Sequence, residues 1–97
     1  MDVFSDYNVF KVLENSKSIS IIVYLGTHNR CKKSELYATL SNSVIMPRKL
    51  DDLQNAGLIE LVPDSRSTAT LVQLTDTGRE VAALLTKVGN LLLEAQS

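Results

Sequence analysis

The sequence predicts a single α+β domain that is mainly helical and carries one small β-hairpin. Apolar residues recur at helical spacing along most of the chain, and two β-branched segments flank a turn near residues 63–67. The chain has 97 residues, 44% of them hydrophobic and 22% charged, which is the composition of an ordinary globular domain. We therefore expect one domain over residues 1–97, with its core in about 16–74 and a separate C-terminal helix over 75–97.

Three helices and a strand stub are expected in the first 40 residues. Apolar spacing predicts a short helix over about 6–14 and a second over roughly 17–26. Gly26 is expected to end the second helix, because glycine tolerates a left-handed C-terminal conformation. Residues 31–33 leave room for a strand stub only. Ser34 is then a good N-cap for a third helix of two turns.

A polar turn and a fourth helix are expected next. Residues 41–43, Ser-Asn-Ser, compete for backbone hydrogen bonds and predict a tight turn. Apolar residues then recur at i, i+4 and i+7 over a helix that ends near Ala56, just before Gly57. Pro47 fits only the first turn of a helix, so we favour a start near Met46.

A hairpin and a long helix complete the chain. β-branched and apolar residues predict strands over 58–62 and 68–74. Thr75 is expected to cap the last helix, whose apolar residues keep a nearly seven-residue repeat. Gly78 would permit a close approach to the hairpin, and Gly89 suggests a close helix crossing or a kink.

This order of helix, short helix, turn, helix, hairpin and helix is that of a winged helix-turn-helix domain. Residues 50–59, LDDLQNAGLI, resemble the L-x-x-L-x-x-x-G-L-I at the end of the recognition helix in winged-helix transcriptional regulators. Residues 74–80, LTDTGRE, are similar to the L-T-x-x-G-R-E that follows the wing in the MarR, HxlR and PadR groups. The resemblance spans roughly residues 16–90 and implies a DNA-binding regulator.

Charge is uneven along the chain, although the formal net charge is only -1. Residues 30–49 carry five basic residues and one acidic residue, a net charge of +4, and residues 50–64 carry four acidic residues. The near-neutral total excludes an obviously basic nucleic-acid coat protein. A local basic segment can still attract phosphate, although such a run is often only solvated surface.

We predict a DNA interface around the fourth helix, because a major groove admits one α-helix whose angle the preceding helix and turn set. Arg48 is expected at a guanine edge or a phosphate, Lys49 at a phosphate, and Arg66 at the minor groove or its flanking phosphates. The predicted DNA-contacting residues are Lys32, Lys33, Ser34, Ser41, Asn42, Ser43, Val44, Ile45, Pro47, Arg48, Lys49 and Arg66.

Alternatives for this surface stay open. Arg48 and Asp52 would form an i, i+4 ion pair that merely solubilises the helix. Val44, Ile45 and Pro47 are unusually apolar for a groove-reading face, so thymine methyls, the core or a protein partner would all suit them. A protein-interaction module on the same fold is therefore the main alternative function, and an architectural DNA-binding protein of low specificity is another.

We expect the protein to act as a homodimer, because two copies double the phosphate contacts and match a palindromic operator. The apolar stripe of the last helix is broader than a small domain needs. The predicted dimerisation residues are Phe4, Tyr7, Phe10, Val81, Leu84, Leu85, Val88, Leu91, Leu92 and Ala95. The alternative is a monomer in which the N-terminal helix covers this stripe.

No other chemistry is expected. We expect Cys31 in the core and His28 in an exposed loop, and one cysteine with one histidine make no zinc cluster. Since no catalytic triad or glycine-rich phosphate loop is recognisable, we expect neither a cofactor nor enzymatic activity. No apolar run approaches the roughly 20 residues of a membrane span, and signal-peptide features are lacking, so a cytoplasmic location is expected. Nothing marks a pocket for a small-molecule effector.

Overall fold

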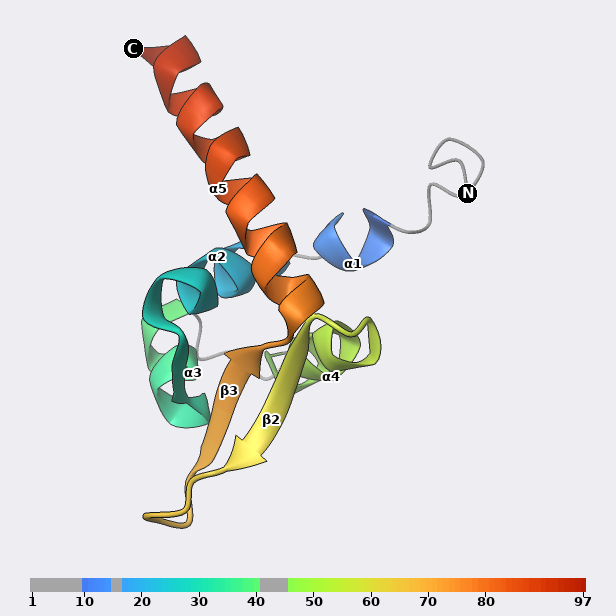
Figure 1. Ribbon diagram of the computed structural model, residues 1–97, viewed down its shortest axis with the longest axis vertical. Helices are drawn as coiled ribbons and strands as arrows, with labels where there is room; N and C mark the ends of the chain where they lie inside the picture. Colours follow the sequence, from blue (N-terminus) through green and yellow to red (C-terminus); the bar gives the residue numbers. More distant parts are fainter. Residues whose placement is uncertain (1–9, 15–16, 41–45) are drawn as a thin grey trace.

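A computed structural model describes residues 10–14, 17–40 and 46–97 and places eight elements along them. In chain order they are α1 (Lys11–Glu14), α2 (Ser18–His28), β1 (Arg30–Lys32), α3 (Lys33–Leu40), α4 (Met46–Asn55), β2 (Ile59–Pro63), β3 (Thr70–Leu74) and α5 (Asp76–Gln96). The β2–β3 hairpin and the C-terminal half of α5 project from opposite ends of a helical body (Figure 1). The predicted α+β fold, mainly helical with one hairpin, is confirmed.

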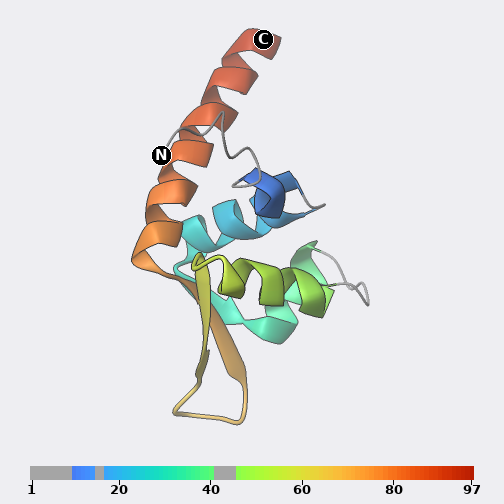
Figure 2. The same ribbon diagram turned by 90° about the vertical axis from the view of Figure 1, so that its right-hand side faces the viewer.

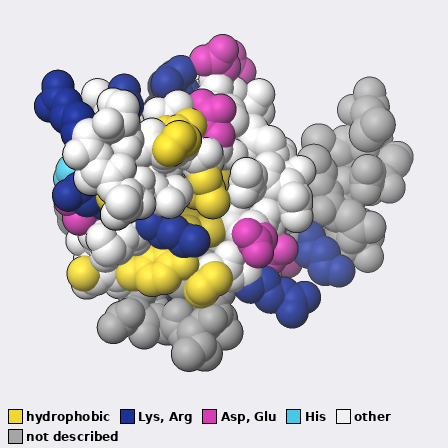
Figure 3. Space-filling model, turned by 90° about the horizontal axis from the view of Figure 1, so that it is seen from below, with side chains coloured by type: hydrophobic (Ala, Val, Ile, Leu, Met, Phe, Trp, Pro, Cys, Tyr) yellow, Lys and Arg dark blue, Asp and Glu magenta, His cyan; other side chains and the backbone are white. Residues whose placement is uncertain are grey.

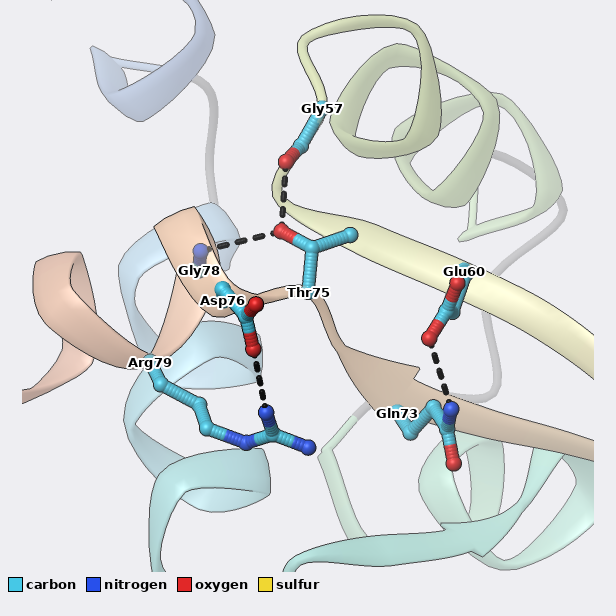
Figure 4. Close-up of polar contacts among 7 residues, drawn as sticks. All are labelled: Gly57, Glu60, Gln73, Thr75, Asp76, Gly78 and Arg79. Carbon is cyan, nitrogen blue, oxygen red and sulfur yellow. Dashed lines mark hydrogen bonds and ion pairs between the residues drawn. The ribbon is translucent and has the colours of Figure 1, made fainter.

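The three strands form one antiparallel sheet in the order β1-β3-β2. β3 lies in the middle, with Val72 and Leu74 buried and Gln73 on the opposite face. The Nε2 of Gln73 donates a hydrogen bond of 2.7 Å to Oε1 of Glu60 on β2 (Figure 4). One face of the sheet therefore closes the core, and the other carries polar side chains, as side chains alternate along a strand.

The core forms where α2, α3 and α4 pack against the inner face of the sheet, and Figure 2 shows these helices beside the base of the hairpin. Each large aliphatic side chain removed from water contributes about 1.5–3 kcal/mol to folding. Cys31 is buried among them, as predicted. The large side chains with almost no exposed surface are Ile21, Ile22, Leu25, Leu36, Leu50, Leu53, Ile59, Val72 and Leu74.

The end of α2 differs from the prediction. The helix continues past Gly26 to His28 and ends at Asn29, whose φ is 64°. Gly26 instead lies where α2 packs on α5, and a Cβ added there would come 2.9 Å from the Cβ of Ala82. Glycine at this position is explained by a close helix crossing. His28 is exposed as expected, but in the last turn of α2, where its ring stacks on Tyr24.

The start of α5 follows the prediction. Thr75 caps the helix by accepting a hydrogen bond of 3.0 Å from the backbone N–H of Gly78. The Thr75 hydroxyl also donates to the carbonyl oxygen of Gly57 at 2.6 Å (Figure 4). A Cβ at Gly78 would overlap the carbonyl oxygen of Leu58, which confirms the expected close approach to the hairpin. Among the described residues the crossing suggested at Gly89 is not formed, because no heavy atom outside the helix's own backbone lies within 4 Å of a Cβ built there.

The other element boundaries agree closely with expectation. α4 spans Met46–Asn55 with Pro47 in its first turn, and the hairpin strands are confirmed. α3 begins at Lys33, so Ser34 lies inside the first turn and the prediction that it precedes the helix as N-cap is wrong. This shift follows from β1, which ends at Lys32 and leaves no residue between strand and helix. The expected turn at 41–43 and most of the expected helix over 6–14 lie outside the described residues.

Candidate nucleic-acid interface

Helix α4 has one buried and one exposed side. Leu50 and Leu53 are buried against the domain, whereas Pro47 and Arg48 are exposed. Among the residues that the structure describes, one ion pair has its charged atoms within 4.0 Å, and it joins Arg79 to Asp76 rather than involving Arg48. The alternative in which Arg48 serves a solubilising pair with Asp52 is therefore not supported. The Arg48 guanidinium is open to an external acceptor.

Lys49 lies elsewhere than expected. Its side chain is only 9% exposed, so its placement on the free face of α4 is wrong. Lys49 precedes Leu53 by four residues and therefore lies along the buried side of the helix. Lysine tolerates such a position because its aliphatic stem packs against apolar surface while the ammonium group reaches outward. A phosphate contact by Lys49 has no support in this geometry.

The tip of the hairpin is organised by a carboxylate. Asp64 accepts hydrogen bonds from the backbone N–H of Arg66 at 3.0 Å and from the Ser67 hydroxyl at 3.1 Å. These bonds, led by that from Arg66, lower the pKa of Asp64 below its ordinary value, and the nearby charges of Lys32 and Arg30 lower it further. The Arg66 side chain is exposed at this ordered tip, as predicted.

Strand β1 supplies basic residues on the outer face of the sheet. Arg30 and Lys32 are exposed, and Cys31 between them is buried. Burial, and to a lesser extent the charge of Glu35, raise the pKa of the Cys31 thiol, which suits a core residue. The prediction of contact residues included Lys32 but missed Arg30. The alternation of charged, apolar and charged residues in a strand stub would have placed both on one face.

A surface hollow of about 420 Å³ joins the start of α3 to the start of β3. It brings together two lysines and several hydroxyl-bearing residues. The hydroxyl of Tyr37 is buried without a hydrogen-bond partner among the described residues, and its pKa is raised by burial and then by Asp51. Two ammonium groups beside hydroxyl donors suit a phosphate. Lys32, Lys33, Ser34, Tyr37, Ala69 and Thr70 line this hollow.

Seen end-on, the hairpin end of the molecule carries Lys and Arg side chains on several sides, with acidic and apolar groups between them (Figure 3). This pattern differs from a continuous basic field. It suits a few separate phosphate contacts. Five of the predicted contact residues lie outside the described part of the chain: Ser41, Asn42, Ser43, Val44 and Ile45.

The predicted dimerisation residues fall into three groups. Val81 and Leu85 are partly buried against the core of their own chain. Phe4 and Tyr7 lie outside the described residues. The third group is exposed and comprises Phe10, Leu84, Val88, Leu91, Leu92 and Ala95. Within the described ranges, no helix combines the length and hydropathy needed to cross a bilayer.

No protein-family model matches the sequence, and no curated protein is significantly similar to it. Solved structures do share its fold. Streptococcus pneumoniae FabT in complex with DNA superposes with a TM-score of 0.75 at 20% identity, over 84% of this chain and 58% of FabT. Adhesin competence repressor (AdcR) from Streptococcus pyogenes gives 0.75 at 16% identity, over 97% of this chain and 69% of AdcR. Reduced AbfR bound to DNA gives 0.64 at 18% identity, over 87% of this chain and 70% of AbfR.

This chain thus spans less than two thirds of FabT. α3 and α4 take the places of the two helices of a helix-turn-helix, and the β2–β3 hairpin takes the place of the wing. The chain has a winged helix-turn-helix fold, which it shares with FabT, AdcR and AbfR.

Proposed function

We propose that this chain is a transcriptional regulator that binds double-stranded DNA sequence-specifically. The observation that carries the proposal is the exposed edge of α4, with Arg48 free, beside a hairpin whose ordered tip presents Arg66. Two of the similar structures, FabT and AbfR, hold DNA. In this arrangement α4 enters the major groove while the wing follows the neighbouring backbone.

The contacts divide by chemistry. Arg48 on α4 is suited to a bidentate contact with a guanine edge, which specifies sequence. The hollow with Lys32 and Lys33 takes a phosphate, which sets the register of the protein on the duplex. Arg66 reaches the minor groove or the phosphates beside it. Arg30 joins this set as a backbone contact, because it shares the outer face of β1 with Lys32.

The regulator acts as a homodimer in this proposal. One domain of net charge -1 offers few phosphate contacts, and a second copy doubles them. The exposed leucines of α5 supply a surface that such a dimer would cover. We further propose that this regulator works in the cytoplasm.

A selection of bound sequences from a random duplex library, followed by titration of the selected duplex at several salt concentrations, tests the proposal. We expect log K to fall with log salt by about 0.9 per phosphate contact. Arg48→Ala should weaken binding by about 1–3 kcal/mol and relax the preference at one base pair. Arg66→Ala should weaken binding to all sequences and lower the salt slope.

Arg79→Ala is the matched control, since Arg79 is also exposed but lies on α5 and pairs with Asp76. It should leave affinity and salt slope unchanged. A folded protein that binds no duplex at low salt contradicts the proposal. A low ratio of selected to random-site affinity would instead identify an architectural DNA-binding protein.

A further inference from the structure

The C-terminal half of α5 has apolar side chains that the other described residues of its chain leave exposed. α5 is 21 residues long, and Gly78 and Ala82 near its start are buried. Further along, Leu84 is 61% exposed, Val88 50% and Leu91 64%. This half of the helix extends beyond α2 (Figure 1). We call Leu84, Val88, Leu91 and Ala95 the α5 stripe.

The spacing of the α5 stripe is that of a coiled coil. Its members follow one another at intervals of four, three and four residues, which are alternating a and d positions of a heptad. Leu85 and Leu92 occupy the e positions on one flank. The g positions on the other flank hold three charged residues: Glu80, Lys87 and Glu94.

The two flanks determine the orientation of a second helix. In a parallel pair, each g position faces an e position of the other helix, so Lys87 would face a leucine and form no ion pair. In an antiparallel pair, e positions face e positions and g positions face g positions. Leucines then lie against leucines and charged residues against charged residues, so the antiparallel orientation fits this sequence.

The charges also select the register. If Val88 lies opposite the second copy's Leu91, then Lys87 lies opposite the second copy's Glu94, and two-fold symmetry repeats the pair. On the flank, the same register sets Leu85, which is partly buried in its own chain, opposite the second copy's exposed Leu92. The four layers that it forms are the members of the α5 stripe, all of them exposed in the single chain.

Neighbouring antiparallel registers fit less well. A shift that sets Val81 opposite the second copy's Leu91 brings Lys87 against Lys87 and Glu80 against Glu94, and like charges repel. A further shift pairs Glu80 with Lys87. That register relies on Val81, which is partly buried in its own chain, and leaves Leu91 and Ala95 without partners.

We propose that two copies of this chain associate through α5 as an antiparallel two-helix coiled coil whose two-fold axis passes between Gly89 and Asn90. The proposal rests on the homodimer proposed above and adds its orientation, its register and the Lys87–Glu94 ion pairs. In this arrangement the two winged domains lie at opposite ends of the paired helices.

Cysteine cross-linking tests the orientation, in a Cys31→Ala background that removes the native thiol. In the proposed register Leu84 shares a layer with the second copy's Ala95, and a disulfide needs a Cα separation of about 4.4–6.8 Å. The two Leu84 positions lie about 17 Å apart along the helix axis, at 1.5 Å per residue. Mixing the Leu84→Cys and Ala95→Cys proteins under oxidation should give a mixed disulfide dimer, and Leu84→Cys alone should give none.

A disulfide dimer from Leu84→Cys alone, without the mixed product, overturns the antiparallel arrangement. Sedimentation equilibrium of the unchanged protein separates this result from failure of the dimer itself. A monomer at 100-fold the concentration used for DNA titration overturns both proposals, whereas a dimer with the parallel disulfide overturns the orientation only.

Charge exchange tests the register. Lys87→Glu should raise the dimer dissociation constant about tenfold, because both ion pairs become repulsive. Adding Glu94→Lys to that variant should restore the original constant. Adding Glu80→Lys is the matched control and should not restore it. Rescue by Glu80→Lys in place of Glu94→Lys would overturn the register.

Discussion

Two glycines in the same helix have opposite surroundings. Gly78 is buried under the carbonyl of Leu58, where a Cβ has no room, whereas Gly89 faces open space. Glycine inside a helix costs about 1 kcal/mol relative to alanine, because its backbone loses more freedom on folding. The cost at Gly78 is offset by the close approach of α5 to the hairpin. Among the described residues of one chain, no contact offsets this cost at Gly89.

Alanine substitutions at these glycines should therefore have opposite effects. Gly78→Ala should lower the free energy of unfolding by about 2 kcal/mol, because the new methyl group meets a backbone carbonyl that cannot turn away. Gly89→Ala should raise it by up to about 1 kcal/mol. Urea denaturation followed by circular dichroism measures both. Equal stability of the Gly78→Ala and parent proteins would contradict the described packing.

Lys49 permits a second comparison between single residues. Its stem packs in the domain while the neighbouring Arg48 is exposed. Lys49→Met retains the aliphatic stem, so we expect the free energy of unfolding to change by less than about 1 kcal/mol. Duplex affinity should fall less than for Arg48→Met, measured by the same titration. A larger loss of affinity for Lys49→Met would restore the phosphate contact that burial argues against.

At the scale of elements, patterns that act locally predicted the structure well. Pro47 and Gly57 bracket α4, and Thr75 caps α5, because each acts through its own backbone neighbours. The prediction that Gly26 ends α2 was wrong, because a glycine that ends a helix and a glycine at a helix crossing look alike in sequence. The distinction depends on Ala82, which lies 56 residues further along the chain.

The same limit applies to the candidate site. Turn chemistry correctly placed Arg66 at an exposed tip, because the hydrogen bonds that order this tip join residues close in sequence. The position of Lys49 depends on the way α4 packs on the rest of the domain, and helical spacing alone does not specify it. The hollow beside Tyr37 depends on the start of β3, which lies more than 30 residues further along the chain. The sequence pattern around Tyr37 therefore did not predict that its hydroxyl lies beside such a hollow.

The hairpin tip carries a pH-dependent prediction. The carboxyl pKa of Asp64 is lowered from 3.8 in the folded state, so its contribution to stability is fully present well above pH 3.8 and is lost as pH falls through the folded pKa. NMR titration of the Asp64 carboxyl should give a midpoint below 3.8. The amide shift of Arg66 should follow the same midpoint, since that amide donates to the carboxylate. A midpoint at or above 3.8 would contradict the hydrogen-bonded tip.

At the scale of the whole molecule, two surfaces with different proposed roles lie at opposite ends. Figure 2 shows the hairpin and the C-terminal half of α5 at opposite ends of the molecule. The hairpin tip carries Arg66 of the proposed DNA interface, and the free half of α5 carries the exposed leucines. Neither surface is evident in a net charge of -1 or in a composition of 44% hydrophobic residues. Their separation means that association of two copies leaves the proposed DNA contacts uncovered.

Substitutions at two leucines distinguish a specific dimer interface from nonspecific hydrophobic association. Leu91 belongs to the α5 stripe, and Leu93, 68% exposed, lies on another side of the same helix. Leu91→Asp should give a monomer by sedimentation and weaken duplex binding at least tenfold, because phosphate contacts are halved. Leu93→Asp should remain dimeric with unchanged affinity. Equal effects of the two substitutions would show that the apolar stripe has no specific partner.

A single residue joins the wing to the helix that leaves it. Thr75 separates β3 from α5, and its hydroxyl is held both by Gly57 and by Gly78. Because these two hydrogen bonds tie Thr75 to both neighbouring segments, we expect the hairpin and the first turns of α5 to move as one rigid unit. In a dimer held through α5, the distance between the two wing tips would then be fixed. Operators would be selected by the spacing of their half-sites as well as by their bases.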